Sequence, residues 1–366
     1  MANSFLTVSE IAERSLPFLE ANLGFAGAVN RDYDNAYMKK GDTVQVRKPE
    51  IFTATEFVEA SGVTFGEVSE EAVNVQLDTI LTVDKKVGSK ELTMNINDFE
   101  IQYIMPAMKG LAQKIDENLA ALYKDIPYSF GTAGTTPDAL SDITGAKKIL
   151  EENKAPRSPR YLFIDEAAED KFLQLDSFAE IDKSAEPSIL REGMLGKKYG
   201  FNIWMDQNVA DHTKGTLAGS PLTNVATAGS TTIPVDGATA GTTLVHGDLI
   251  QIAGNQYVVT ADVTLTGGAG NVAIYPALVA DSDGEAVTVT ASSTSNLAFH
   301  RDAFCLVNRP LEPPMGGAES ATINMGGLSI RVTYGYDMTY KRNMMSWDIL
   351  TGFETLYPEL AVRLLG

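Results

Sequence analysis

The clearest periodic pattern in the chain is a stripe of apolar residues at three- and four-residue steps between residues 97 and 124. Such a stripe predicts a long amphipathic helix with one buried face. Pro106 is expected to kink this helix or to begin a second one, and Pro127 to end it. The stripe consists of Ile101, Ile104, Met108, Leu111, Ile115, Leu119 and Leu122.

A second, shorter helical pattern covers residues 3 to 23, with Ile11 and Leu16 among its apolar positions. Pro17 is expected to interrupt it, because proline lacks the amide that a helix interior needs. The pattern therefore predicts a short amphipathic arm.

The pattern changes to alternation from residue 40 onward, which predicts antiparallel strands at 41–49, 51–57 and 73–79. Gly62 and Gly66 punctuate the connection between the last two. Residues 56–71 are acidic and poor in large aliphatic side chains, so they have little to bury against one another. A projecting hairpin that contacts a partner is the expected structure.

A helix at 140–152, a buried strand at 160–165 and a helix at 166–175 follow in order, which indicates an α/β layer. Strand-like runs at 201–209 and 296–307 are expected to belong to the same host domain.

Between these two runs the composition changes abruptly, because no lysine or arginine occurs from Gly215 to His300. Short strands are predicted at 249–253, 256–260, 272–275 and 286–290, with a tight turn at Gly254-Asn255 and a hairpin tip at 267–270. The stretch is interpreted as an inserted β-barrel or sandwich, which requires host strand ends that are close together and exposed.

Composition narrows the class of protein further. The 366 residues are 44% hydrophobic, which is enough for two or three packed units. A formal net charge of -19 disfavours a protein that gains affinity for nucleic acid by neutralising phosphates. No secretion signal and no membrane-spanning segment is recognised, so the chain is expected to be cytosolic when made.

Candidate chemistry is sparse. The single cysteine, Cys305, excludes an intrachain disulfide and lies in an apolar run, where a buried position is expected. The three histidines share no ligand-like spacing. Asp206, Asp211 and His212 could form a metal or acid/base site but are interpreted as solvated junction residues, and no serine lies in a nucleophile elbow. The sequence thus predicts no catalytic residues, no cofactor and no metal, and a protein that is not an enzyme.

Several segments, taken in order, resemble the major capsid (coat) proteins of tailed double-stranded DNA bacteriophages, in the branch that carries an inserted β-domain. Order and spacing carry the resemblance, which spans most of the chain. The segments are residues 40–49, 97–125, 160–165, 190–203, 296–311 and 329–364.

The resemblance implies an α+β protein with the tailed-phage major capsid fold. The implied parts are an N-terminal arm at 1–35, an extended β-hairpin loop at 36–90, a peripheral domain with a spine helix at 91–130 and 310–345, an axial α/β domain at 131–212 and 297–309, a C-terminal segment at 346–366, and an inserted all-β, barrel-like domain at 213–296.

The implied function is a structural subunit that self-assembles into hexamers and pentamers of an icosahedral shell around double-stranded DNA, without sequence-specific binding and without a membrane. A scaffolding protein, a portal and maturation by subunit rotation are further implications, as are assembly in the host bacterial cytoplasm and residence in the virion. One alternative is the shell protein of a cellular nanocompartment of the same fold. Another, from a different class, is a surface-binding protein that uses its β-module to bind carbohydrate or a cell surface.

Charge and burial agree with a shell subunit. An arm and a hairpin that cannot bury their own apolar residues are explained if neighbouring copies cover them. Acidic copies repel one another, so their contacts must be locally complementary. The candidate intersubunit contacts are the cations Lys39, Lys40, Arg47 and Lys48 and the acids Glu67, Glu70 and Glu71, with ordinary solvated charge as the alternative.

Overall fold

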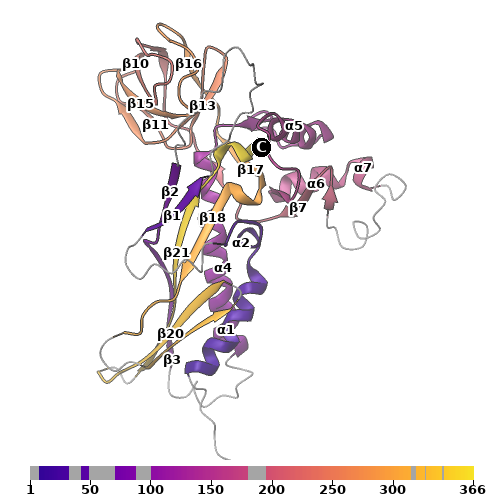
Figure 1. The fold of residues 1–366 in the computed structure, drawn as a ribbon, viewed down its shortest axis with the longest axis vertical. Helices are drawn as coiled ribbons and strands as arrows, with labels where there is room; N and C mark the ends of the chain where they lie inside the picture. The colour runs from indigo at the N-terminus through magenta and orange to yellow at the C-terminus, as the bar shows by residue number, and fades with distance from the viewer. Residues whose placement is uncertain are drawn as a thin grey trace, which may run out of the picture.

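The computed structural model describes residues 8–32, 43–48, 71–87, 100–179, 195–314, 319–325, 327–339 and 342–366. These residues form an elongated molecule with two β-sheets along its body and a small β-domain at one end (Figure 1). The α+β class predicted from the sequence is confirmed.

A five-stranded antiparallel sheet forms one half of the body. In its longest strand, β21, the residues Met345, Trp347 and Ile349 are buried while Met344 points to the other face and is exposed. This alternation places one face of the sheet on the core. The strands are β3 (Thr79–Val87), β18 (Phe304–Arg309), β19 (Glu319–Met325), β20 (Leu328–Asp337) and β21 (Arg342–Thr355).

Helices cover that buried face. The predicted long helix is confirmed as α4 (Met105–Ala120), preceded by the π-helix η2 (Glu100–Ile104) and followed by the 3-10 helix η3 (Ala121–Asp125). Pro106 lies in the first turn of α4, where its missing amide costs no helical hydrogen bond. Ile101, expected on the buried stripe, is instead exposed, because the π-helix changes the angular spacing of the side chains before α4.

The arm prediction needs two corrections. Helix α1 (Val8–Asn22) continues through Pro17, so the expected interruption is wrong. Ile11, Leu16 and Leu19 are buried against α4 and the sheet of the same chain, while Val8 and Phe18 are partly buried. This burial offsets the amide that Pro17 lacks, and the chain itself covers the main apolar stripe of the helix. A buried hydrogen bond from the Trp347 indole to Ser15 Oγ, 3.2 Å long, joins the helix to β21.

The start of the predicted hairpin is also covered by its own chain. Strands β1 (Thr43–Lys48) and β2 (Glu71–Gln76) pair antiparallel, as the alternation predicts. Val44, Val46 and Val75 pack against Cys305 and Val307 of β18, and Cys305 is buried as expected. The predicted strand at 51–57 and the tip, apart from the backbone of Glu71, lie outside the described residues.

A seven-stranded mixed sheet forms the other half of the body, in the order β4-β22-β17-β5-β7-β6, with β8 beside β17. The predicted helix and strand order is confirmed here. The strands are β4 (Ser129–Phe130), β5 (Arg160–Ile164), β6 (Gly196–Lys198), β7 (Phe201–Met205), β8 (Asp211–His212), β17 (Ser293–His300) and β22 (Ala361–Leu365).

Both faces of this sheet are buried. Helices α5 (Leu140–Glu152), α6 (Glu166–Leu173) and α7 (Asp176–Ala179) share a core with one face. On the other face Phe163 and Phe299 meet Phe25 of the short helix α2 (Phe25–Ala28), with ring centroids 4.2 and 5.3 Å from that of Phe25. The same cluster contains residues of α4, so one core joins the two halves of the body.

The chain passes twice from one sheet to the other. The 3-10 turn η4 (Arg301–Ala303) separates β17 from β18, and η5 (Pro358–Leu360) separates β21 from β22. Residues 304–309, which the sequence assigned to the axial range with residues 297–300, therefore pair in the five-stranded sheet. The polar residues His300, Arg301 and Asp302 interrupt the apolar sequence at this crossing, but they do not show that the two strands belong to different sheets.

Between β8 and β17 the chain forms a closed barrel. A six-stranded sheet runs from β16 to β9, and bridges between Leu222 and Ala286 join its two edges. The strands are β9 (Gly219–Thr223), β10 (Thr232–Ala238), β12 (Leu249–Ile252), β13 (Asn255–Val259), β15 (Gly270–Tyr275) and β16 (Val287–Val289), with β11 (Thr242–Leu244) and β14 (Val263–Leu265) paired separately.

The turn between β12 and β13 differs by one residue from the prediction. Ala253 and Gly254 occupy its centre, both with positive φ, and Ile252 pairs with Asn255. This is the backbone of a primed hairpin turn, in which both central residues have positive φ. The tip at 267–270 connects β14 to β15, as expected.

The barrel has an independent core and enters and leaves the body at one place. Its core contains Ile233, Ile250, Tyr257, Val259 and Val272, all within the barrel. Strand β8 pairs with the start of β17, so the two connections lie side by side. β17 begins at Ser293, inside the range 213–296 assigned to the inserted module.

Candidate functional site

Three of the predicted intersubunit contact residues, Arg47, Lys48 and Glu71, lie at the base of the β1–β2 hairpin in the described part of the chain. Lys48 lies opposite Glu71 in the strand register, and Arg47 opposite Ala72. The Arg47 side chain is exposed. Lys39, Lys40, Glu67 and Glu70 lie outside the described residues, so their expected role stays a prediction.

Lys48 already has a partner within its own chain. Its ammonium nitrogen lies 4.7 Å from the ring centroid of Tyr357, a cation–π contact. The contact fixes the end of β1 beside the crossing from β21 to β22. The structure thus brings Arg47, Lys48 and the Glu71 backbone together at the base of the hairpin.

A buried polar cluster joins the inserted barrel to the body. We call Tyr123, His212, Asp248 and Arg363 the joint. Asp248, in the turn before β12, is fully buried and accepts hydrogen bonds from the amides of Val245 (2.8 Å) and Gly215 (3.1 Å) and from Nε2 of His212 (2.9 Å). Because a carboxylate only accepts, the His212 proton is on Nε2. In the neutral imidazole, Nδ1 then accepts from the Tyr123 hydroxyl, 2.9 Å away.

Arg363 brings the positive charge into this cluster from the middle of β22. Its guanidinium donates to the carbonyl oxygens of Gly247 (2.7 Å) and Lys124 (3.1 Å) and lies 5.1 Å from the Tyr123 ring centroid. Burial lowers the pKa of Arg363 to about 9, while the nearby acids Asp125 and Asp248 favour its charged form. The side chain therefore stays charged at neutral pH.

Two further polar contacts and one apolar cluster surround the joint. His246 Nε2 lies 2.9 Å from Asp125 Oδ1, and Gln256 donates to Ser129 Oγ at 2.7 Å. Leu249 and Val258 of the barrel pack on Leu365 of β22. Gly247 has φ +99°, and a Cβ there would lie 2.9 Å from Lys124 Cγ, so a larger residue would be strained and would collide with the Lys124 side chain.

Sequence reasoning missed this cluster. His212, interpreted as a solvated junction residue, is buried, whereas Asp211 is exposed as expected. An arginine within the apolar run Ala361–Leu365 was the available signal, because a charge in a buried strand requires polar partners. Tyr123, His212 and Asp248 resemble an acid/base relay in geometry, but all three are less than 10% exposed, which leaves no access for a substrate.

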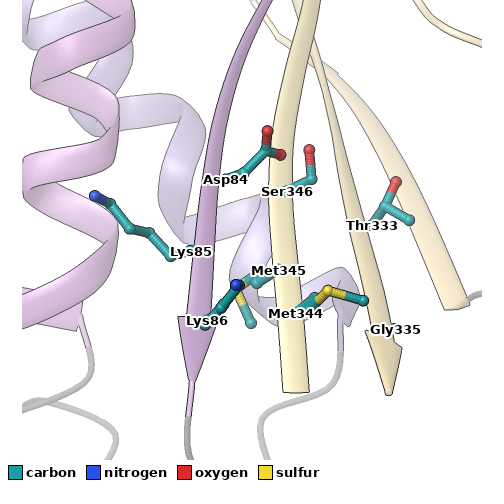
Figure 2. Close-up of a pocket in the computed structure, with 8 residues that line it drawn as sticks. All are labelled: Asp84, Lys85, Lys86, Thr333, Gly335, Met344, Met345 and Ser346. Atoms are coloured by element: carbon teal, nitrogen blue, oxygen red, sulfur yellow. The ribbon is translucent and has the colours of Figure 1, made fainter. Parts of the chain in front are cut away.

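A shallow cavity of about 420 Å³ lies on the five-stranded sheet, on adjacent parts of β3, β20 and β21 (Figure 2). Exposed Met344 and the polar side chains of Asp84, Lys86 and Ser346 line it. Beside it, Ser346 donates to Asp348, which also forms a 2.6 Å ion pair with Arg331.

The described part of the chain contains no group of three or more His, Cys, Asp or Glu side chains that could hold a metal ion. None of the helices described is both long and apolar enough to cross a membrane.

Known structures of similar shape come from viral particles. A chain in a structure of Mycobacterium phage Che8 is 15% identical and has a TM-score of 0.51, with 93% of this chain and 90% of that chain covered. The chain has the tailed-phage major capsid fold. A capsid structure of the cyanophage P-SCSP1u is 14% identical, covering 89% and 84% of the two chains with a TM-score of 0.48.

A virus-like particle from Pyrococcus furiosus is 12% identical, covering 97% of each chain with a TM-score of 0.41. No protein-family model matches the sequence, and no curated protein sequence matches it either. The capsid fold is thus recognised here by shape, at identities where sequence comparison gives no match.

Proposed function

We propose that this protein is the major capsid protein of a tailed double-stranded DNA bacteriophage, a structural subunit without catalytic activity. The observation that carries the proposal is the likeness to the phage Che8 chain over nine-tenths of both chains. In this proposal copies of the chain form hexamers and pentamers, and these form an icosahedral shell around the DNA. A scaffolding protein and a portal take part in assembly, which occurs in the host cytoplasm, and the product is the virion.

Exposed apolar residues support self-association. At the free end of the five-stranded sheet, Met338 is 82% exposed, Tyr336 51% and Met344 42%. The cavity of Figure 2 lies beside Met344. Apolar side chains grouped at one end of a protein favour a partner that covers them. For a shell subunit this partner is a second copy of the chain.

Net charge agrees with the proposed contents. A charge of -19 per copy gives an inner surface that does not hold phosphate tightly, and the repulsion extends over about the 10 Å Debye length at 0.1 M salt. Packed DNA then stays free to leave the shell. Arg47 and Lys48 at the hairpin base supply positive charge that would suit contacts with acidic neighbours.

Electron microscopy of the purified chain, with and without a co-expressed scaffolding protein, tests the proposal. Closed shells built from rings of five and six subunits are the expected result. A protein that stays monomeric under both conditions and binds a glycan would overturn it in favour of a surface-binding function.

The contents of recovered shells separate the phage from the nanocompartment. Particles isolated from lysing host cells are expected to contain double-stranded DNA protected from nuclease. Shells that always contain a cargo enzyme and never DNA would assign the protein to a cellular compartment instead.

A further inference from the structure

A second buried acid lies on α4, about two helical turns before the joint residue Tyr123, where three parts of the body meet. Asp116 of α4 is 2% exposed and accepts hydrogen bonds from the amides of Gly24 (2.8 Å) and Ala26 (3.0 Å). These amides belong to the turn between α1 and α2. One carboxylate thus holds the first helices of the chain against the long helix.

The same carboxylate faces another acid from the seven-stranded sheet. Asp206 follows β7, and its Oδ1 accepts from both the amide and the side chain of Asn208. Its Oδ2 lies 3.1 Å from the position that a Cβ would take on Gly24, and Asp116 Oδ2 lies 3.6 Å from that same position, so the two oxygens are less than about 7 Å apart. Gly24 leaves the space that both oxygens use.

The charged groups around Asp116 are few among the described residues. Both acids line a cavity of about 300 Å³ together with Lys109, two turns earlier on α4. The α1–α2 turn presents backbone amides and Asn22, and the segment after β7 presents Asp206 with Gln207 and Asn208. No ion pair between Lys109 and either acid is formed in this part of the structure.

We propose that Asp116 and Asp206 form a proton-dependent contact that adjusts how the first helices and the segment after β7 pack on α4. When both acids are charged they repel across Gly24, and the segment leading toward the inserted barrel is pushed away from α4. When one proton is bound, the repulsion is removed and the three elements pack together.

Electrostatics agree with this geometry. Burial, and to a lesser extent the charge of Asp206, raise the pKa of Asp116 to about 6, although the three amides of the α1–α2 turn act in the opposite direction. The folded chain therefore binds this proton more tightly than the unfolded chain. The stability that the proton provides is complete below about pH 4 and is lost as pH rises through about 6.

Unfolding of the full chain by denaturant at pH values from 4 to 8 tests the proposal. For the wild type we expect this site to lower the folding equilibrium constant by about 100-fold between pH 4 and 7, because each unit of pKa difference is a factor of ten. D206N should move the midpoint of the decrease to lower pH, and D116N should remove it. D211N, which changes an exposed acid five residues further on, should behave as the wild type.

Carbon-13 NMR of aspartate carboxyl groups gives a second readout that does not depend on the folding of D116N. We expect one carboxyl in the wild type to titrate near pH 6 and the same signal to titrate at lower pH in D206N. Identical titration in the wild type and D206N would overturn the proposal. So would superimposable stability profiles for the wild type and a folded D116N.

Discussion

Replacing Asp248 with alanine is expected to loosen the joint between the inserted barrel and the body. The amides of Gly215 and Val245 would lose their acceptor, and His212 would lose the partner of its Nε2. An unsatisfied buried donor costs about 1–3 kcal/mol, so the two amides alone give a loss of about 2–6 kcal/mol. D248N should cost less, because the asparagine amide can donate to the other tautomer of His212.

Trypsin provides an assay that reports on this joint alone. Lys214 is exposed beside the joint, and no further lysine or arginine follows it until Arg301. Trypsin therefore cannot cut within the barrel, and cleavage after Lys214 measures how often the joint opens. A loss of 2 kcal/mol corresponds to a rate about 30 times higher when opening and closing are fast.

The expected order of cleavage rates after Lys214 is D248A, then D248N, then the wild type. D283N is the matched control, since Asp283 is an exposed acid on the same barrel. Equal rates for D248A, D283N and the wild type would show that Asp248 does not hold the barrel against the body, whatever the effect of the variants on overall stability.

Three further outcomes are expected. Ser15→Ala should lower the free energy of unfolding by about 1 kcal/mol, measured by denaturant titration, because the Trp347 indole loses its acceptor while buried. Cys305 should react with a thiol reagent only when the chain unfolds, so its labelling rate should rise with denaturant in step with unfolding. Met344→Glu should reduce shell formation in electron micrographs and leave the melting temperature within about 2 °C, because an exposed position carries little folding energy. Rapid labelling of Cys305 in the native chain would contradict the second of these predictions, and normal shells from Met344→Glu would contradict the third.

Much of the fold could be predicted from the sequence because the relevant forces are local. The three- and four-residue spacing from Ile104 to Leu119 predicts α4 correctly, and the order of α5, β5 and α6 follows from simple patterns. The change in composition at Gly215 indicates a separate barrel. In each case the sequence pattern and the element that it predicts lie within the same stretch of chain.

The errors arise where distant segments determine the outcome. Pro17 does not end α1, because Leu16 and Leu19 are buried by residues far along the chain. The sequence around His212 is typical of a junction between domains. The side chain is nevertheless buried, and its hydrogen-bond partners Tyr123 and Asp248 lie 89 and 36 residues away. The crossing at Arg301–Ala303 is marked only by a short polar break, His300 to Asp302, which does not show that β17 and β18 pair in different sheets. Pairing at long range therefore decided each of these features.

The absence of lysine and arginine from the barrel affects how the buried carboxylate of Asp248 is accommodated at the joint. A barrel without lysine or arginine cannot neutralise its own buried carboxylate at Asp248 by an ion pair with a long basic side chain. The body brings a cation, Arg363, close to it from β22, which lies between β17 and the short edge strand β4 of the seven-stranded sheet. The two charges attract one another without a direct ion pair, and hydrogen bonds hold each of them, from amides and His212 to Asp248 and from Arg363 to carbonyl oxygens. The barrel has its own apolar core, but its attached geometry depends on the body, and this fixes the direction in which a shell subunit would present it to its neighbours.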